Sequence, residues 1–574
     1  MTGKNKNLAS ICVGPKSTIG SVLSFLALNK SSRTLLPAGI ALVVAPDKKL
    51  LGIATDGDIR RGLSKGISLE DPVSKVMNPN PFLIEGPKSS HEILSLISNK
   101  IKKEHWHKDR LSKIIIVDKD KKVIDLVSFY DLWQKSDVRF KQMGVVGLGY
   151  VGLTLAVTLA DLGFRVLGYD ADRKVANSLK SGRPHFFEQG LEQLLKDNLN
   201  VNFKIAANFE AENNCDVYFV AVGTPVDKKT KKPDLSYIKS AAENLGQILK
   251  FGDAVILRST VPIGTTRNVV VPILEKKSSL KAGDDFLVAF APERTVEGKA
   301  LEELRKLPQV IGGINWASAD LAASIFNHVT HSVVLVDSPE EAEMVKLVNN
   351  VYRDVTFAFA NELALICHKL GINTSRVIEA ANRGYERGQV PLPSPGVGGV
   401  CLEKDPFLFI ESAKKINYLP QLAQSARSIS QAMVDFIARE VNLFLKSKNR
   451  QSPKVAILGL AFKGRPVTSD IRGSTAVSLV EKLKKSGIND INIYDPVVRR
   501  DAIKHLGVKH SHSPKEVFTR ADAVVVMNNN PAFEDLNMRQ LLGWASNNVL
   551  FFDTWGLYKE EEIKKVEGVK YKRL

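Results

Sequence analysis

The sequence predicts an α/β protein in which two parallel-sheet units are joined by a helical segment and preceded by a smaller α+β pair. Three observations predict it: an internal repeat near the N-terminus, a glycine-rich turn between an apolar strand and a helix, and a second strand–turn–helix unit near the C-terminus. The chain has 574 residues, of which 44% are hydrophobic and 25% charged. That composition is typical of a globular protein, and the length allows roughly three to five domains.

The charge and the cysteines narrow the class of protein. The formal net charge is +18, but the lysines are scattered and no nucleic-acid-binding module accompanies them, so we expect small anionic ligands and no nucleic acid. No apolar run could span a bilayer and none follows the N-terminal lysines, so we expect neither a membrane span nor a secretory signal. The four cysteines lie far apart, without metal-ligand or disulfide spacing, which favours a cytoplasmic protein without a metal site.

The first element is an internal repeat. The segments LVVAPDKKLLGIATDGD and IIIVDKDKKVIDLVSFYD align with a constant offset of 73 residues. Each copy predicts a strand, a charged turn, a second strand and then a helix that opens with Ser or Thr followed three residues later by Asp. Two matched copies indicate a pseudo-symmetric pair that packs together. The matched residues are Asp47 and Asp120, Thr55 and Ser128, and Asp58 and Asp131.

This repeat resembles a tandem of CBS domains, which would occupy residues 1–137. The resemblance implies an adenine nucleotide in the cleft between the copies. Thr55 and Ser128 would then contact phosphate, and Asp58 and Asp131 would hold the ribose hydroxyls. The alternative is that all four residues are helix N-caps, which prefer the same residue types.

The second element, MGVVGLGYVGLTLAVTLADLGFRVLGYDAD, predicts an apolar strand, a glycine turn, a helix and a second strand that ends in an acid. Gly147, Gly149 and Gly152 fit G-x-G-x-x-G, and Asp170 follows at the distance of a residue that holds the adenosine ribose. The helix N-terminus offers backbone N–H groups to a pyrophosphate, and Asp170 would repel a 2′-phosphate. We therefore expect a Rossmann-like domain that binds NAD over residues 141–338.

Further strand-then-loop units follow within this domain: DVYFVAVGTPVD, AVILRSTVPIGTT and FLVAFAPERTVEG. In an open parallel sheet, the loops beyond the carboxyl ends of the strands line the ligand crevice. The pattern therefore places several loop residues near the cofactor, namely Thr224, Pro225, Ser259, Thr260, Glu293 and Glu297.

The third and fourth elements are a helical segment and a second α/β unit. Residues 339–445 predict helices, and EEAEMVKLVNNVYRDVTFAFANELALICHKLG is apolar on more than one face. We expect this long helix to pair with its copy in a homodimer, or in a larger homo-oligomer. Residues 453–574 repeat the strand–turn–helix pattern, with LGLAFKG where a glycine fingerprint would stand. Two Rossmann-like units that face each other can bind two nucleotide-containing molecules.

One cysteine stands in an unusual context. In PSPGVGGVCLEKDP, Cys401 follows a run of glycines and precedes Lys404 and Asp405. Glycines let the backbone approach a ligand closely, and a thiolate among cations is a nucleophile. The alternative is a buried cysteine that follows a loop.

The motifs GLGYVG, VGTP, STVPIGTT, PERTVEG, EAEMVKLVNN, PGVGGVCLEKDP, and LGLAFKG with SDIRGST occur in this order. From residue 141 to about residue 560, the sequence resembles the nucleotide-sugar 6-dehydrogenases of the UDP-glucose/GDP-mannose dehydrogenase family. The resemblance implies oxidation of a primary alcohol at the sugar's C6 to a carboxylate, with two NAD+ in succession. The thiolate would hold the aldehyde intermediate as a thiohemiacetal, which is then oxidised to a thioester.

The resemblance also implies roles for individual residues. Cys401 would be the nucleophile. Lys346 and Asn350, four residues apart on one helix face, would stabilise the developing oxyanion, unless Lys346 is an ordinary solvated lysine beside a capping asparagine. Asp405 would position water and share proton transfer with Lys346, and Lys404 would contact cofactor or substrate.

Other residues would surround this set. Glu297 would act in the hydrolysis of the thioester, and Thr260 would order the attacking water. The remaining assignments concern the ligands: Thr224 and Pro225 for the cofactor, and Glu293, Lys463 and Arg472 for the nucleotide sugar, whose diphosphate suits the two cations.

The substrate and the reaction leave alternatives open. The segments PERTVEGKALEELRKLPQVIGG and NRGYERGQVPLPSPGVGG look like the UDP-N-acetylhexosamine dehydrogenases, so we expect a UDP-N-acetylhexosamine first, UDP-glucose second and GDP-mannose third. A two-electron dehydrogenase of similar architecture would not need Cys401. A nucleotide-sensing protein without activity is the third class, and the intact set of Cys401, Lys346, Asn350 and Asp405 argues against it.

Overall fold

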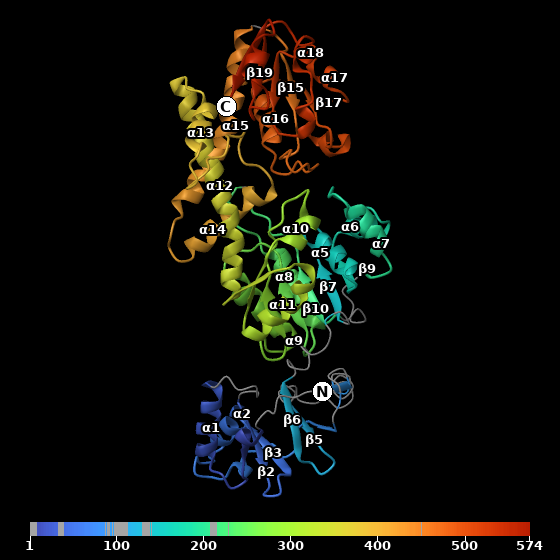
Figure 1. Ribbon diagram of the computed structural model, residues 1–574, viewed down its shortest axis with the longest axis vertical. Helices are drawn as coiled ribbons and strands as arrows, with labels where there is room; N and C mark the ends of the chain where they lie inside the picture. Colours follow the sequence, from blue (N-terminus) through green and yellow to red (C-terminus); the bar gives the residue numbers. More distant parts are fainter. Residues whose placement is uncertain are drawn as a thin grey trace. The chain divides into compact units, whose positions relative to one another are not determined.

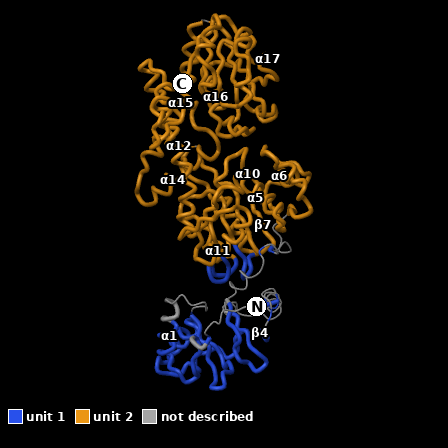
Figure 2. The backbone as a smooth tube through the Cα atoms, viewed as in Figure 1, with its two compact units in different colours: residues 1–141, 249–254, 278–287 blue, residues 142–248, 255–277, 288–574 orange. Residues whose placement is uncertain are grey.

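The computed structural model describes residues 8–31, 39–86, 88, 92–93, 96, 113–128, 138, 141–206, 215–227, 229–448 and 450–574. They form two compact units, which Figure 2 distinguishes. One comprises residues 1–141 with 249–254 and 278–287, and the other comprises 142–248, 255–277 and 288–574. Over these described ranges, no helix combines the length and the apolarity that crossing a bilayer requires.

The N-terminal repeat forms two three-stranded sheets of the same design. In each sheet the first strand pairs parallel with the second, and the second pairs antiparallel with the third. Each hairpin has a bulge, at Val43–Val44 and at Ile116–Val117, and each turn has a lysine with positive φ, Lys48 at 67° and Lys121 at 62°. The elements are β1 (Cys12–Val13), α1 (Ile19–Ser31), β2 (Ile40–Val44), β3 (Leu50–Thr55), α2 (Asp56–Leu63), β4 (Leu83–Glu85), β5 (Lys113–Val117) and β6 (Val123–Ser128).

The two copies of the repeat share a core. Side chains alternate between the two faces of a strand, so in β2 Ile40 and Leu42 join a buried cluster with Ile115 and Leu126 of the second copy. The backbone N–H of Leu50 also donates to a carbonyl in the turn of the second copy at 3.0 Å. The predicted packing of the two copies against each other is therefore confirmed.

An eight-stranded sheet follows, with the order β14-β13-β12-β11-β10-β7-β8-β9. The central strand β7 pairs parallel with β8 on one side and with β10 on the other, so the chain changes direction across the sheet at β7. In such sheets ligands bind beyond the carboxyl ends of the strands at that point. The strands are β7 (Gln142–Val146), β8 (Arg165–Tyr169), β9 (Phe203–Ile205), β10 (Val217–Val220), β11 (Ala254–Leu257), β12 (Leu287–Phe290), β13 (Gln309–Gly313) and β14 (Val333–Val336).

The helices of this region connect successive strands of the sheet (Figure 1). They are α5 (Tyr150–Asp161), α6 (Arg173–Lys180), α7 (Leu191–Asn198), α8 (Ser236–Ile248), α9 (Val271–Ser278), α10 (Ala300–Lys306) and α11 (Trp316–Val329), with a π-helical turn over Thr266–Val270.

The helix expected from Glu340 is α12 (Pro339–Leu370). Ser338 caps its first turn by accepting the N–H of Glu341 at 3.2 Å, and Gly371, with a φ of 68°, ends it. It packs side by side with α15 (Gln421–Ser447), and the buried carboxylate of Asp354 on α12 pairs with Arg427 on α15 (Figure 1). Two further helices, α13 (Thr374–Asn382) and α14 (Val400–Lys414), lie between them in sequence.

The C-terminal unit is a six-stranded sheet with the order β17-β16-β15-β18-β19-β20, and all of its neighbouring strands are parallel. Both faces are covered: in β15, Val455 and Ile457 enter one core cluster, and Ala456 and Leu458 enter another. The elements are β15 (Lys454–Leu458), α16 (Thr475–Lys485), β16 (Asp490–Tyr494), β17 (Lys509–His510), α17 (Pro514–Phe518), β18 (Ala523–Val526), α18 (Met538–Leu542), β19 (Val549–Asp553), α19 (Glu560–Ile563) and β20 (Val569–Arg573).

Candidate active site

Cys401 lies in the first turn of α14 and is exposed, so the alternative of a buried structural cysteine is wrong. Helix N-termini and nearby cations favour a thiolate. Protein atoms nevertheless surround the sulfur, and this desolvation, together with the carboxylate of Asp405, raises the pKa of the Cys401 thiol, while Lys346 and Lys404 oppose the rise. The thiol therefore needs a proton acceptor when it reacts.

The glycines before Cys401 make close contacts with protein. A Cβ at Gly399, where φ is 92°, would meet the ring of Phe462 at 2.6 Å, and a Cβ at Gly398 would meet the carbonyl of Gly473 at 2.6 Å. The N–H of Gly399 also donates to that carbonyl at 3.0 Å. The expectation that these glycines make room for a ligand is not what the contacts indicate: they let the loop pack against the C-terminal sheet's loops.

Asp405 connects α14 to α12. Its carboxylate, 1% exposed, accepts a hydrogen bond from Asn350 Nδ2 at 2.5 Å and lies 2.8 Å from the ammonium of Lys404. Asp405 is thus held between an amide and a cation, four residues after Cys401. The structure brings together three of the residues expected at the site.

Lys346 lies one turn before Asn350 on α12 and is only 7% exposed. The alternative of a solvated lysine is therefore wrong. Its ammonium lies near enough to Cys401 and to Glu293 to lower the pKa of each. A buried cation beside an accessible sulfur is suited to stabilise an oxyanion that forms on a sulfur adduct.

The loops after β10 and β11 meet α14. Buried Thr224 donates its hydroxyl to the carbonyl of Thr260 at 2.5 Å and accepts a hydrogen bond from Lys404 Nζ at 3.2 Å. Ser259, also buried, donates to the carbonyl of Val222 at 2.7 Å, while Pro225 is exposed on the same rim. Lys404 therefore links the loop after β10 to Asp405, the acid four residues after Cys401.

The glycine turn after β7 fits a dinucleotide. Gly147 has a φ of 89°, and a Cβ at Gly152 would meet the carbonyl of Gly147 at 1.8 Å, so both residues keep the helix close to the strand. Gly149 is the N-cap of α5 and has open space where a Cβ would stand, which leaves the helix N-terminus free for a pyrophosphate. Asp170, just past β8, accepts the N–H of Leu148 at 2.7 Å and stands at the place of a ribose-binding acid.

Glu297 lies between the two α/β regions. Burial, Asp470 and Glu188 raise its pKa to about 7, although Arg472 and Lys463 act in the opposite direction. Arg472 Nη2 lies 3.9 Å from the carboxylate, and Lys463 Nζ donates to the backbone carbonyl of Glu297 at 2.7 Å. A carboxylate with a pKa near neutrality is suited to act as a general base.

Two residues expected to contact the nucleotide sugar have protein partners. Glu293 is buried and pairs with the buried guanidinium of Arg258. Burial alone would raise the pKa of Glu293, but Arg258, the N–H of Thr295 and the ammonium of Lys346 together lower it. Removing one partner of such a buried pair typically lowers the free energy of unfolding by about 3–5 kcal/mol, so we expect Glu293 and Arg258 to contribute to the stability of the fold. Arg472 forms an ion pair with Asp470 at 2.6 Å but keeps its side chain 65% exposed, so it can still meet a phosphate.

Sequence reasoning missed several residues that support this site. Glu343 on α12 accepts hydrogen bonds from the N–H groups of Gly264 and Thr266 and so holds the loop after Thr260. Glu188 accepts the N–H groups on either side of the turn after Glu297, and Tyr150 donates to it. Glu188 lies in the segment PHFFEQG and Glu343 in EEAEMVK, and neither segment has a periodic pattern that indicates such a supporting role.

At the N-terminal repeat, Thr55 is the N-cap of α2. Asp58 accepts the Thr55 N–H at 3.0 Å and Thr55 accepts the Asp58 N–H at 3.3 Å, a reciprocal capping box. The capping alternative therefore accounts for this copy. In the second copy, Ser128 pairs with Lys113 at the strand position where Thr55 pairs with Ile40 in the first copy. Asp131 lies outside the described residues.

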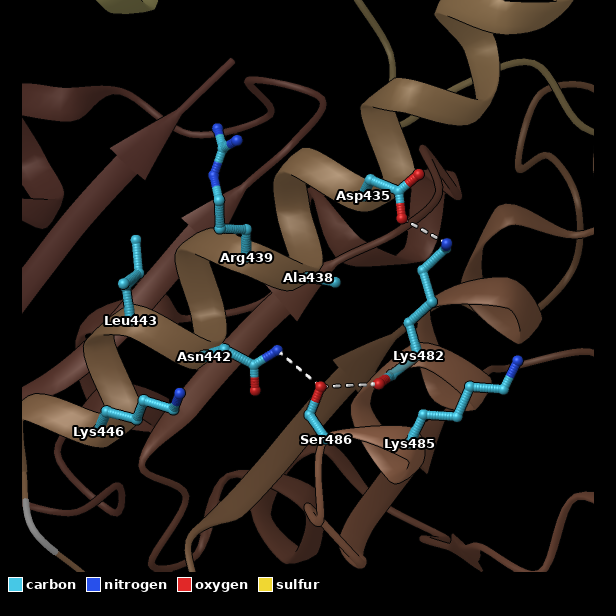
Figure 3. A pocket seen from close by; sticks show the side chains of 9 residues that line it. All are labelled: Asp435, Ala438, Arg439, Asn442, Leu443, Lys446, Lys482, Lys485 and Ser486. Carbon is cyan, nitrogen blue, oxygen red and sulfur yellow. Dashed lines mark hydrogen bonds and ion pairs between the residues drawn. The ribbon is translucent and has the colours of Figure 1, made fainter.

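A groove between α15 and α16, of about 380 Å³, holds none of the expected site residues. It contains Arg439, Lys446, Lys482 and Lys485, but Lys482 pairs with Asp435 and the other cationic groups point in different directions (Figure 3). This groove is therefore a weaker candidate for the active site than the residues around Cys401. Among the described residues, no group of His, Cys, Asp and Glu could hold a metal ion.

Comparisons with known proteins point to one family. Models of the UDP-glucose/GDP-mannose dehydrogenase family match residues 141–330 as its NAD binding domain, 340–432 as its central domain and 456–560 as its UDP binding domain. A UDP-N-acetyl-D-mannosamine dehydrogenase from Pyrococcus horikoshii is 34% identical over 425 residues, which cover 74% of this chain and 97% of that protein.

Solved structures agree with the family models. The structure of a UDP-D-ManNAc dehydrogenase from Pyrococcus horikoshii is 32% identical with a TM-score of 0.68, and covers 75% of this chain and 98% of its own. That of a UDP-glucose dehydrogenase from Pyrobaculum islandicum is 30% identical with a TM-score of 0.66, and covers 76% and 98%. The matching family models begin at residue 141, after the N-terminal repeat.

Proposed function

Because the chain belongs to the UDP-glucose/GDP-mannose dehydrogenase family and is an NAD-dependent oxidoreductase, we propose that it oxidises the C6 hydroxyl of a UDP-sugar to the uronic acid in two steps. The observation that carries this proposal is the gathering of Cys401, Lys346, Asn350 and Asp405 at the start of α14. A simple alcohol oxidation needs no accessible cysteine beside a buried cation.

The first step needs a proton acceptor for the C6 hydroxyl and a hydride acceptor for its carbon. NAD+, when bound at the glycine turn, accepts the hydride at each oxidation. In our proposal Lys346 and Asp405 take up and pass on the hydroxyl proton, directly or through water, and Lys346 with Asn350 stabilises the negative charge that develops on the C6 oxygen. The product of this step is the C6 aldehyde.

The second step is covalent. The Cys401 sulfur adds to the aldehyde carbon, its proton is transferred to the protein's acid–base groups, and the C6 oxygen is protonated to give a thiohemiacetal. Loss of a hydride and the hydroxyl proton gives a thioester on Cys401. Water then adds to the thioester carbon with Glu297 as its base, the C–S bond breaks, and the carboxylate leaves while Cys401 is regenerated. The sum is one alcohol, one water and two NAD+ converted to one carboxylate, two NADH and three protons.

The substrate in this proposal is a UDP-N-acetylhexosamine. Relatives named as UDP-N-acetyl-D-mannosamine dehydrogenases, each 34% identical, come from Pyrococcus horikoshii and Methanocaldococcus jannaschii. Lys463 and Arg472 would contact the diphosphate. Both belong to the domain matched as UDP binding, and both lie beside the turn that carries Glu297. UDP-glucose is the second candidate, supported by the Pyrobaculum islandicum structure, and GDP-mannose is the third.

The test is the number of NADH formed per sugar consumed, measured for UDP-N-acetylmannosamine, UDP-N-acetylglucosamine, UDP-glucose and GDP-mannose in parallel. We expect two NADH per sugar, and the highest kcat/KM for an N-acetylated sugar. One NADH per sugar, with the aldehyde as the end product, would refute the covalent route and leave a two-electron dehydrogenase. Turnover only of UDP-glucose or GDP-mannose would refute the choice of substrate but keep the chemistry.

We propose that the chain is divided into four domains. They are a CBS pair over residues 1–137, a Rossmann-like NAD domain over 141–338, a helical dimerisation domain over 339–445 and a Rossmann-like nucleotide-sugar domain over 453–574. The matched bulges and turns of the two N-terminal hairpins support the first of these. The pair would bind an adenine nucleotide and regulate the enzyme.

We expect isothermal titration calorimetry of the full chain to show binding of AMP, ADP or ATP. Asp58→Ala should weaken it at least tenfold, because a ribose hydroxyl would lose its acceptor. Asp47→Ala, in the exposed turn of the same hairpin, is the matched control. Absence of binding by all three nucleotides would contradict the regulatory proposal and leave Thr55 and Asp58 as helix caps.

The dimer in this proposal forms through α12. Large apolar side chains at spacings of four and seven residues make an exposed stripe along the helix, where a monomer would leave them in water. They are Met344, Val348, Tyr352, Phe359, Ile366 and Leu370.

We expect sedimentation velocity to show a dimer or larger assembly at micromolar concentration. Phe359→Glu should weaken the assembly by two orders of magnitude or more, because it places a charge in an apolar interface. Val201→Glu is a matched control, since Val201 is an exposed apolar residue of a turn after α7. A wild-type chain that sediments as a monomer would rule out this interface.

A further inference from the structure

The turn that carries Glu297 is fixed at its backbone on both sides. Before Glu297, the N–H of Val296 donates to Glu303 at 2.7 Å. After it, Gly298 has a φ of 92°, and a Cβ there would meet the carbonyl of Val467 at 2.7 Å. The backbone at Glu297, and with it the direction of the Cα–Cβ bond, is therefore held by these contacts.

Two side chains from distant parts of the chain complete this support. Glu188, 5% exposed, accepts the N–H of Gly298 at 2.7 Å with one carboxylate oxygen and the N–H of Ala300 at 2.8 Å with the other. Tyr150 donates its hydroxyl to Glu188 at 2.5 Å, and the same oxygen lies 3.4 Å from the carbonyl of Val296. Tyr150 and Glu188 thus contact the residues on both sides of Glu297.

The origin of Tyr150 gives this contact its meaning. Tyr150 is the first residue of α5 and directly follows Gly149, so it belongs to the glycine turn that receives the dinucleotide. Its ring packs against Phe186 with centroids 5.0 Å apart, which holds the hydroxyl in place. The cofactor turn and the Glu297 turn are therefore joined through a single hydroxyl and a single carboxylate.

We propose that Tyr150 and Glu188 are positioning residues for Glu297, and that the pair serves the hydrolysis of the Cys401 thioester. This inference rests on the proposed function, because Glu297 has a base to provide only if a thioester forms. The negative charge of Glu188 also lies near enough to contribute to the raised pKa of Glu297, which makes the Glu297 carboxylate a stronger base towards water.

A purely structural reading assigns Glu188 to the N-terminus of α10, since Ala300 is the first residue of that helix. This reading leaves Tyr150 unexplained, because its hydroxyl donates to Glu188 and caps no backbone group of the helix. Tyr150→Phe therefore separates the two readings: it keeps the ring, its packing on Phe186 and both N–H bonds to Glu188.

The experiment is rapid-mixing kinetics of the full chain with its nucleotide sugar and NAD+, combined with intact-protein mass measurement. In Tyr150→Phe we expect a normal burst of about two NADH per subunit, followed by turnover slowed about tenfold, with an acyl adduct accumulating on Cys401. The KM for NAD+ should stay unchanged. Glu188→Gln should behave in the same way with a larger decrease, because the amide keeps one acceptor oxygen and its NH2 group cannot accept the second backbone N–H.

The matched control is Arg305→Met, which removes the ion pair between α10 and Asp161 of α5 without touching the Glu297 turn, and should keep wild-type kinetics. Thioester hydrolysis at the wild-type rate in Tyr150→Phe would overturn the positioning role alone. A loss of the burst together with a raised KM for NAD+ would also overturn it, since the tyrosine would then serve the cofactor turn. Formation of only one NADH per sugar by the wild-type chain would overturn the proposed function as well.

Discussion

Replacing Cys401 by alanine is expected to abolish formation of the uronic acid, with turnover lowered about 10⁴-fold or more. Removing a covalent nucleophile eliminates the route itself, and the surrounding groups then give only residual catalysis. Because Cys401 is exposed in the first turn of α14, the smaller side chain leaves no cavity and the fold should be unchanged. The measurement is NADH per sugar under single-turnover conditions, with product analysis.

Two observations would complete this test. Iodoacetamide should inactivate the wild-type chain and label Cys401, because the thiol is accessible even though its pKa is raised. Cys12→Ala, in the other compact unit, is the matched control and should keep full turnover and full sensitivity. If Cys401→Ala still gave two NADH per sugar, the sulfur would have no covalent role.

The second large effect is expected for Glu297→Gln. An amide cannot accept a proton from water, so hydrolysis of the thioester should slow by about 10²- to 10³-fold. Both oxidations precede that step, so the variant should still release about two NADH per subunit in a burst and then stop with sugar bound to Cys401. Mass spectrometry of the stalled protein measures the adduct directly.

The pH dependence gives an independent check on Glu297. Its pKa is raised to about 7, and only the carboxylate form acts as a base, so the hydrolysis-limited rate should rise as pH increases through about 7. Glu297→Gln should lose this ascending limb. A variant whose burst and steady state slow equally, without an adduct, would show that Glu297 acts before the thioester forms.

The parts of the molecule that the sequence predicts well depend on local patterns. Local sequence patterns predict the glycine turn, Asp170 and the long helix α12. Each depends on the strand or helix period of one continuous segment and on the residues that cap it. The pairing of Lys346 with Asn350 on one face follows from helical geometry alone. These features require no knowledge of what lies opposite them.

The features that the sequence does not reveal concern partners that are distant along the chain. The sequence places Glu293 beside the substrate and does not reveal that Arg258, 35 positions earlier, is buried against it. The glycines before Cys401 predict space for a ligand, whereas Phe462 and Gly473 fill that space. Glu188 meets its turn across 110 positions, a separation at which no periodic pattern indicates contact.

The two sides of α12 have different surroundings, and this has a consequence for how the enzyme would respond to dilution. One side buries Glu343, Lys346 and Asn350, and the other exposes the apolar stripe. Both sides belong to one continuously hydrogen-bonded helix, so a shift of its outer side would move the residues on its inner side with it. If the stripe is the subunit contact, specific activity should fall as the protein is diluted below the dissociation constant of the dimer, and the loss should precede any loss of secondary structure.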